Sequence, residues 1–176
     1  MTTVFTIGHS THPIEVFLRM LHAHEIRTLV DVRTVPKSRH NPQFGEDLLP
    51  VSLSESGISY QRFAELGGLR HSRKDSINGG WRNASFRGYA DYMQTPEFAA
   101  GIARLLELAQ AAGPLAIMCA EALPWRCHRS LIGDALLVRS VEVLDIMSEK
   151  EARAESITRF AVVDGLTITY PPGPDA

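Results

Sequence analysis

The segment LAIMCAEALPWRCHRSLIGDAL, residues 115–136, decides the fold because it joins a buried strand to a buried helix through a short polar loop. Residues 115–120 are almost entirely apolar, which favours a strand covered on both faces. A helix is predicted from about residue 127 to residue 139, with an inner stripe of Leu131, Ile132, Ala135 and Leu136. A strand followed by a helix in this way is typical of a parallel sheet with helices on its faces.

The same alternation extends in both directions from this segment. Strands are predicted at residues 3–8, 28–33, 58–60 and 141–146, and helices at residues 14–21, 45–55 and 96–112. A capping box at residues 148–151 predicts a last short helix, and Asp164-Gly165 predicts the turn of a hairpin. Residues 64–90 are glycine-rich, basic and aromatic, without a convincing period.

We therefore expect a single α/β domain over residues 1–176. Its predicted architecture is three-layer α/β/α with a mostly parallel sheet. A long basic and aromatic loop is expected over the C-terminal strand ends, and a hairpin at the C-terminal end of the chain.

Composition excludes several classes of protein. The chain is 44% hydrophobic and 22% charged, as in an ordinary globular domain, and no apolar run approaches the roughly 20 residues that cross a membrane. The first residues carry no basic start and no small-residue cleavage site, so no signal peptide is expected. Two cysteines without such a signal favour a cytoplasmic location and count against a disulfide scaffold.

The net charge of −2 conceals an uneven distribution. Residues 32–93 hold nine Lys and Arg against six Asp and Glu, whereas the rest of the chain holds nine against fourteen. A basic middle section favours an anionic small molecule or nucleic acid as partner. The modest overall charge counts against a dedicated DNA-binding protein.

Polar residues follow three of the predicted strands at the points where these strands end. They are Gly8-His9-Ser10, Asp31 with Arg33, and Cys119 with Glu121. In open parallel sheets, ligands bind in the crevice beyond the carboxyl ends of the strands. The sequence therefore predicts one cleft built from segments that are far apart in the chain.

Both cysteines are candidates for a reactive thiol. Cys127 lies near a helix start and beside Arg126, His128 and Arg129, and such cationic surroundings stabilise a thiolate. Cys119 ends an apolar strand, so a role in the core competes with a catalytic one there. The two could also pair as an attacking and a resolving thiol.

The remaining candidates divide by chemistry. His128 or His9 is expected to transfer protons, and Glu121 is either a general acid or base, or a solvent-facing or ion-paired acid. Asp31 is expected to orient a donor such as His9 or an arginine. The predicted substrate-binding residues are Ser10, Asp31, Arg33, Ser38, Arg39, Tyr89, Arg126 and Arg129.

Metal and phosphatase chemistry are not favoured. Four residues could form a zinc set: His9, Cys119, Cys127 and His128. However, Cys-x7-Cys-His is not a recurrent metal-binding spacing, so no metal is expected. Cysteine phosphatases carry an arginine six positions after the nucleophile, where this chain has Trp125 after Cys119. There is no P-loop, dinucleotide fingerprint or HExxH motif, so no cofactor is expected.

Seven motifs in order resemble one family. They are TIGHS, DVR followed by PKSR, NPQF, LGG, FRGYADYM and CAEALPWRCHR, between residue 6 and about residue 136. Together they resemble the bacterial and archaeal family known as domain of unknown function 488. The resemblance implies a three-layer α/β fold and a shared polar site, and it implies no particular reaction.

Two functions follow from these observations. The first is a thiol-dependent enzyme with a cysteine, histidine and arginine site that binds an anionic, phosphate-bearing substrate. The second is a non-catalytic nucleic-acid-binding module in which the basic aromatic loop contacts backbone and bases and the cysteines are structural. The sequence does not indicate an oligomeric state.

Overall fold

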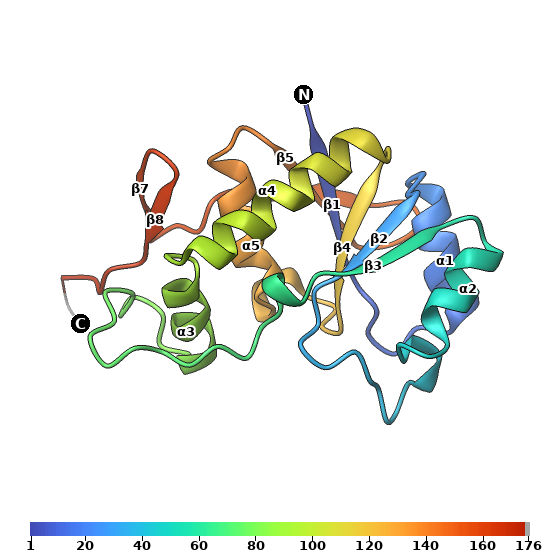
Figure 1. The fold of residues 1–176 in the computed structure, drawn as a ribbon, viewed down its shortest axis with the longest axis horizontal. Helices are drawn as coiled ribbons and strands as arrows, with labels where there is room; N and C mark the ends of the chain where they lie inside the picture. The colour runs from blue at the N-terminus through green and yellow to red at the C-terminus, as the bar shows by residue number, and fades with distance from the viewer. Residues whose placement is uncertain (175–176) are drawn as a thin grey trace.

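The computed structural model describes residues 1–174 and has an α/β architecture in which helices cover both faces of a six-stranded sheet (Figure 1). The strand order is β3-β2-β4-β1-β5-β6. Every neighbouring pair is parallel except β5 with β6, so the predicted mostly parallel sheet is confirmed. The strands are β1 (Thr3–Gly8), β2 (Thr28–Asp31), β3 (Ser59–Arg62), β4 (Leu115–Cys119), β5 (Glu142–Ile146) and β6 (Ala152–Ala154).

Two groups of helices form the outer layers. Leu115, Ile117 and Cys119 of β4 belong to the core under one group, and the alternate residues Ala116 and Met118 belong to the core under the other. This alternation is the period of a strand buried on both faces, which confirms the three-layer architecture. The first group is α3 (Ala84–Tyr92), α4 (Pro96–Ala111) and α5 (Arg129–Leu137), and the second is α1 (Ile14–Ala23) and α2 (Leu49–Glu55).

The chain reverses its direction of travel across the sheet between β1 and β4. It leaves β1 through α1 toward β2, and it leaves β4 through α5 toward β5, on the opposite face. Such a switch point opens a crevice at the carboxyl ends of the two strands. The end of β1 approaches the loop after β4 so closely that a Cβ on Gly8 would lie 1.8 Å from the carbonyl oxygen of Glu121. Only glycine fits at this position.

The segment without a predicted period contains a helix, α3. Its first turn is capped by the Asn83 side chain, which accepts hydrogen bonds from the backbone N–H groups of Ser85 and Phe86 at 2.8 and 3.3 Å. A Cβ on Gly88 would lie 2.0 Å from the carbonyl oxygen of Arg70, so the loop packs directly on the helix backbone. Tertiary packing thus stabilises a helix that a mid-helix glycine disfavours.

The helix predicted after the capping box is wrong. Residues 148–150 form a turn, in which the backbone N–H groups of Met147 and Ser148 both donate to the carbonyl of Glu151 at 2.9 and 3.2 Å. The next residues form β6, which pairs with β5 in antiparallel register. The free edge of β5 supplies a ladder of backbone hydrogen bonds, which outweighs the local capping signal.

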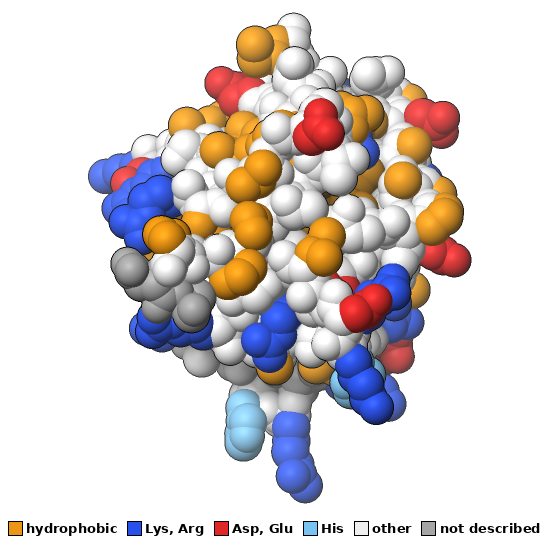
Figure 2. Space-filling view, turned by 90° about the vertical axis from the view of Figure 1, so that its left-hand side faces the viewer, with side chains coloured by type: hydrophobic (Ala, Val, Ile, Leu, Met, Phe, Trp, Pro, Cys, Tyr) orange, Lys and Arg blue, Asp and Glu red, His pale blue; other side chains and the backbone are white. Residues whose placement is uncertain are grey.

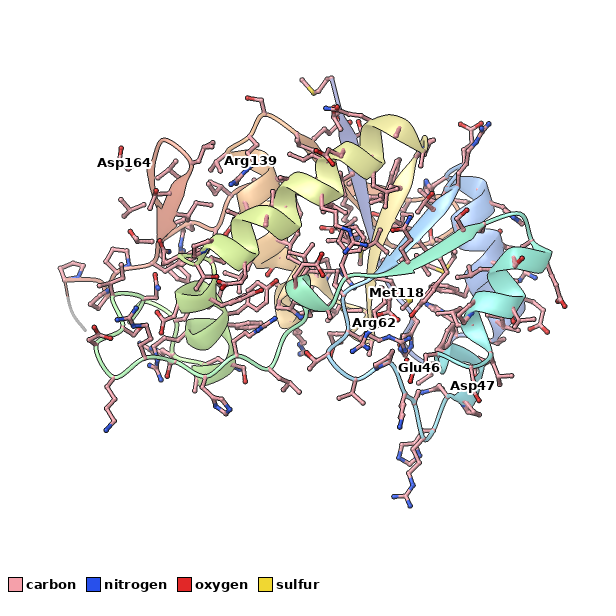
Figure 3. The ribbon with its side chains drawn as sticks, viewed as in Figure 1. Glu46, Asp47, Arg62, Met118, Arg139 and Asp164 are labelled. Atoms are coloured by element: carbon pink, nitrogen blue, oxygen red, sulfur yellow. The ribbon has the colours of Figure 1, made fainter. Side chains whose placement is uncertain are left out.

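The predicted C-terminal hairpin is confirmed. It consists of β7 (Val162–Asp164) and β8 (Thr167–Thr169), with Gly165 at φ +60° in the turn. Figure 3 shows Asp164 at the tip of this hairpin, away from the sheet. Arg62 and Met118 lie near the lower end of the sheet in the same view. On the hairpin side, separate hydrophobic side chains occupy the middle of the face and basic ones lie toward its edges (Figure 2). No helix within residues 1–174 has the length and apolarity needed to span a membrane.

Candidate functional site

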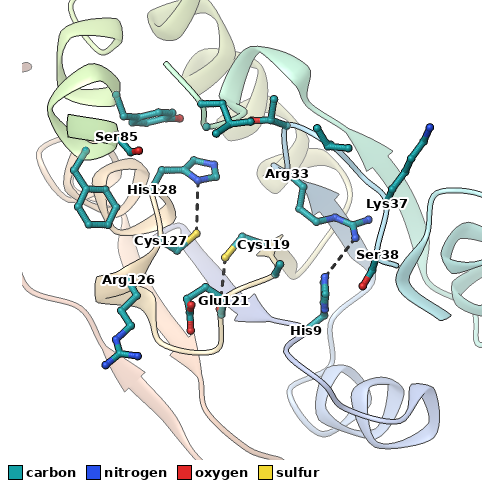
Figure 4. Close-up of a pocket in the computed structure, with 17 residues that line it drawn as sticks. His9, Arg33, Lys37, Ser38, Ser85, Cys119, Glu121, Arg126, Cys127 and His128 are labelled. Carbon is teal, nitrogen blue, oxygen red and sulfur yellow. Dashed lines mark hydrogen bonds between the residues drawn. The ribbon is translucent and has the colours of Figure 1, made fainter. Parts of the chain in front are cut away.

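A cavity of about 400 Å³ opens at the carboxyl ends of β1, β2 and β4 (Figure 4). It lies where the sequence predicted a cleft, and part of the long loop borders it through Gly68 and Leu69. The structure places nine of the predicted site residues in its wall: His9, Arg33, Ser38, Tyr89, Cys119, Glu121, Arg126, Cys127 and His128. Ser10, Asp31, Arg39 and Arg129 do not line it.

Arg129 lies directly beneath the cavity floor and is fully buried. Its Nη1 donates to the Cys119 sulfur at 3.0 Å and to the Glu121 carbonyl at 2.8 Å, while Nη2 donates to the Ala122 carbonyl at 3.1 Å. Its Nε has no hydrogen-bond partner, and none of the ion pairs within residues 1–174 involves this guanidinium. A buried cation without a carboxylate partner favours negative charge on the sulfur it contacts.

The two thiols differ sharply in acidity. Burial alone would raise the pKa of Cys119, but a hydrogen bond from the Cys127 thiol and the positive charge of Arg129 outweigh it and lower the pKa to about 7. The same hydrogen bond and burial raise the pKa of Cys127 above its usual value. Although Cys127 has the helix position that favoured it in the sequence, the surroundings of Cys119 favour the thiolate.

Cys127 lies between Cys119 and the ring of His128 (Figure 4). Its sulfur is 3.6 Å from His128 Nδ1 and accepts a hydrogen bond from the Arg129 backbone N–H at 3.5 Å. His128 Nε2 lies 2.9 Å from the Val32 carbonyl, so Nε2 carries the ring proton and Nδ1 is free to accept one. Burial lowers the pKa of His128 to about 4, which keeps this ring neutral at pH 7.

His9 is also neutral, because burial lowers its pKa to about 4. Its Nδ1 donates to the Ser10 carbonyl at 2.9 Å, and its Nε2 faces Arg33 Nη1 at 3.4 Å. The ring stacks on Phe44 with the centroids 4.3 Å apart. These contacts engage both ring nitrogens, so His9 is better placed to hold Arg33 than to transfer a proton.

Asp31 holds Arg33 in a buried bidentate ion pair. Its Oδ2 accepts from Arg33 Nη2 at 2.7 Å and its Oδ1 from Arg33 Nε at 2.9 Å. The Tyr60 hydroxyl donates to the same Oδ2 at 2.6 Å, and burial followed by this contact raises the pKa of Tyr60. Asp31 thus contacts an arginine, one of the two kinds of donor that the sequence suggested for it.

Charged side chains surround the mouth of the cavity. Arg126 and Lys37 are exposed there, and so is Glu121, whose carboxylate accepts only a 3.5 Å hydrogen bond from the Leu123 N–H. Glu121 forms no ion pair with Arg33 or Arg129 in the part of the chain that the structure describes; its backbone carbonyl, not its carboxylate, contacts Arg129. Arg39 lies outside this cavity, in the loop after β2.

A group of carboxyls lies behind Arg129, on the side away from the cavity. Asp145 and Glu155 lie close enough to influence each other's pKa, and the Thr6 hydroxyl donates to Asp145. Burial and the nearby Asp145 raise the pKa of Glu155 to about 9, and burial raises that of Asp145. Glu155 packs over Gly133 of α5, where a Cβ would lie 1.9 Å from its Oε2.

Sequence reasoning missed Tyr60 and the carboxyl group behind Arg129. Tyr60 sits on a short strand with an ordinary pattern. Asp145 lies in β5, which was predicted as a strand. Glu155 follows β6, where the sequence predicted a helix instead of the pairing that brings Glu155 inward. Within residues 1–174 there is no cluster of three His, Cys, Asp or Glu side chains arranged to hold a metal ion.

Comparison with known proteins gives one match. The family model described as Domain of unknown function DUF488 matches residues 13–136, from the start of α1 to the end of the inner stripe of α5. The match includes both cysteines, Arg33 and Arg129, and begins after His9. No curated protein and no solved structure matches the chain.

Proposed function

The chain belongs to the DUF488 family, and we propose that it is a thiol-dependent enzyme in which Cys119 attacks an anionic substrate held in the cavity. One observation carries this proposal. The Cys119 sulfur accepts a 3.0 Å hydrogen bond from a fully buried arginine that has no carboxylate partner among residues 1–174. The positive charge of an arginine in that position stabilises the ionised form of the Cys119 thiol.

The neighbouring thiol supports the same role. Cys127 keeps its proton, because the neighbouring Cys119 and burial raise the pKa of its thiol. A protonated thiol beside Cys119 helps to stabilise negative charge on that sulfur. The free Nδ1 of His128 lies 3.6 Å from Cys127 and can take that proton when Cys127 is required in ionised form.

The mouth of the cavity supports an anionic substrate. Lys37 and Arg126 are exposed on its wall, and Glu121 is the acidic residue that lines the same wall. Arg33 is rigidly held by Asp31 and turns its Nη1 toward His9 at the cavity wall. Because Asp31 already balances the charge of Arg33, the exposed Lys37 and Arg126 are the groups that attract an anion to the mouth.

The test is the alkylation rate of each cysteine in the native protein as a function of pH, resolved by peptide mass spectrometry. We expect Cys119 to react with iodoacetamide with an apparent pKa near 7 and Cys127 to react far more slowly. Because iodoacetate is anionic, the ratio of its alkylation rate to that of iodoacetamide should be higher at Cys119 than for a small free thiol in the same sample. If Cys119 stays unreactive until the protein unfolds, the enzyme proposal is wrong.

The alternative function, a nucleic-acid-binding module, needs aromatic rings that are free to stack on bases. Tyr89 is buried, and Trp81 packs against Phe86, Phe160 and Tyr170. Tyr92 packs against Phe98, and the Arg70 guanidinium lies over its ring at 3.7 Å from the centroid. These contacts favour the enzyme. Unreactive cysteines together with salt-dependent binding of an oligonucleotide would support the module instead.

A further inference from the structure

The two thiols form a chemically asymmetric pair within one cavity. Both cysteines are free and both line the cavity wall. The same residue, Arg129, contacts both sulfurs: its guanidinium donates to Cys119 and its backbone N–H to Cys127. Figure 4 shows the two sulfurs turned toward each other across the cavity floor. Such an arrangement brings an attacking thiolate and a second thiol together before any reaction.

The charges on the two sulfurs match the two roles of a dithiol. Negative charge on Cys119 is stabilised by Arg129, whereas Cys127 retains its proton beside a neutral imidazole. An attacking sulfur must be ionised first, and a resolving sulfur must be able to lose its proton later. His128 Nδ1 is the acceptor for that proton, because Nε2 is committed to the Val32 carbonyl.

We propose that Cys119 and Cys127 are a dithiol–disulfide couple that reduces hydroperoxides, an activity that rests on the thiolate of the proposed function. In the first step the Cys119 thiolate attacks the terminal oxygen of the hydroperoxide. A sulfur–oxygen bond forms and the oxygen–oxygen bond breaks. Cys119 is oxidised to a sulfenic acid, and the alkoxide that leaves takes up a solvent proton, equivalent to the one that Cys119 released on ionising.

The second step closes the disulfide. Cys127 gives its proton to His128 Nδ1, and its thiolate attacks the Cys119 sulfur. The sulfur–sulfur bond forms as the sulfur–oxygen bond breaks, and the departing hydroxide recovers the proton from His128 as water. An external dithiol then reduces the disulfide by exchange and is itself oxidised. In total, one hydroperoxide and two thiols give one alcohol, one water and one disulfide.

The surroundings favour the disulfide over deeper oxidation. Cys119 is only 3% exposed and Cys127 only 7%, so the sulfenic acid forms in a confined site beside the resolving thiol. The two residues are joined by the short segment that contains η3 (Pro124–Arg126). Since both sulfurs contact Arg129 and both residues line the same cavity, closure needs movement of side chains more than of the sheet.

The experiment treats the fully reduced chain with one equivalent of hydrogen peroxide and, in parallel, of tert-butyl hydroperoxide. After quenching with an alkylating agent, peptide mass spectrometry measures the disulfide between residues 119 and 127. We expect the disulfide as the main product in the native protein. Cys127→Ser should stop at a sulfenic acid on Cys119 that dimedone traps, and Cys119→Ser should leave the remaining thiol reduced.

The opposite result is specific. If native Cys119 goes to the sulfinic acid as fast as it does in Cys127→Ser, with no disulfide, the dithiol proposal is overturned. Cys127→Ala, with circular dichroism to verify folding, replaces the serine variant if that variant does not fold. The measurement on the native protein does not depend on either Cys127 variant.

Iodoacetamide alkylation of the same reduced sample separates the two proposals. Low-pKa alkylation of Cys119 without disulfide formation defeats the dithiol couple and leaves the proposed function standing. Absence of Cys119 alkylation in the folded protein defeats both.

Discussion

Two buried arginines serve this cavity, and they differ in how their charge is balanced. Arg33 is 5% exposed and forms a bidentate pair with Asp31, which Tyr60 supports from the other side. Arg129 is 0% exposed and finds two carbonyls and a sulfur, but no carboxylate within hydrogen-bond distance. The first cation is neutralised by its own partner. The second leaves its charge available, and the thiol of Cys119 is the group that uses it.

The difference separates architecture from chemistry. An ion pair that is fully satisfied holds two strand-end segments in place and changes the acidity of distant groups little. An arginine whose partners are neutral carbonyls lowers the pKa of the one ionisable group that it touches. We therefore expect changes at the Asp31–Arg33 pair to affect mainly stability, and changes at Arg129 to affect mainly the reactivity of Cys119.

The largest expected effect at a fixed pH is on stability, from Asp31→Asn. This change leaves the Arg33 guanidinium buried without its counter-charge, and breaking a buried pair in this way costs about 3–5 kcal/mol. Tyr60→Phe is the matched control, because it removes one hydrogen bond to the same carboxylate at a cost of about 1 kcal/mol. Urea denaturation measures both free energies of unfolding. A loss for Asp31→Asn no greater than that for Tyr60→Phe would contradict the assignment.

Next in size is the effect of Arg129 on the acidity of Cys119. Arg129→Met removes the positive charge at 3.0 Å from the sulfur, and loss of an opposite charge at this range raises a pKa by about 1–3 units. Alkylation of Cys119 at pH 7 should fall about tenfold or more. Arg129→Lys keeps the charge without the guanidinium fork and should give an intermediate pKa, which protects the test if Arg129→Met folds poorly.

The matched control for Arg129 is the double variant Asp31→Asn/Arg33→Met. It removes both members of the neutralised pair together, which avoids an uncompensated buried charge. The pKa of Cys119 should stay within about half a unit of its native value. A shift as large as that in Arg129→Met would erase the distinction between the two arginines.

The sequence indicated the location of this site better than its chemistry. Strand-end motifs predicted that His9, Arg33, Cys119 and Glu121 converge, because parallel strands end at one edge of a sheet. The sequence did not indicate which of the two cysteines has the more acidic thiol. That choice depends on the side chain of Arg129 reaching back across ten positions to Cys119, a contact that only the folded loop creates.

Local sequence patterns also predicted the wrong secondary structure where tertiary contacts were more favourable. The capping box at residues 148–151 predicted a helix, but the edge of β5 offered backbone partners that made a strand of Ala152–Ala154. That strand leads directly to Glu155, so the wrong helix also hid the carboxyl group behind Arg129. α3 was missed for the opposite reason, since its glycine looks unfavourable until the loop carbonyl that needs it is present.

The carboxyls behind Arg129 give a third prediction, on the pH dependence of stability. Burial, with Asp145 and Asp134 nearby, raises the pKa of Glu155 to about 9, so the folded protein holds a proton that the unfolded chain releases near pH 4–5. Its contribution to stability is full below that range and is lost as pH rises toward 9. Glu155→Gln should remove this loss. The free energy of unfolding of the variant minus that of the native protein should therefore rise with pH, by up to about 1.4 kcal/mol per pH unit between pH 5 and 9.

Denaturation at pH 5.5, 7 and 8.5 measures that trend, and Glu151→Gln is the control because Glu151 lies on the surface in an exposed pair with Arg153. A constant difference between Glu155→Gln and the native protein at all three values would mean that Glu155 is ionised in the fold. The pH trend also bears on the comparison between the arginines. It shows whether the carboxyl behind Arg129 is protonated and therefore leaves the charge of Arg129 uncompensated on that side.

The smallest expected effect concerns the mouth of the cavity, where Arg126 is exposed. Arg126→Ala should reduce the advantage of iodoacetate over iodoacetamide at Cys119 by about two- to threefold, since an exposed charge contributes little and is screened by salt. Arg82→Ala, exposed but outside the cavity wall, should leave the ratio unchanged. Added salt should shrink the effect of Arg126 but not the low pKa of Cys119, because Arg129 is buried and Arg126 is not. Equal salt sensitivity of the two quantities would mean that the thiolate is stabilised by the rim of the cavity and not by its floor.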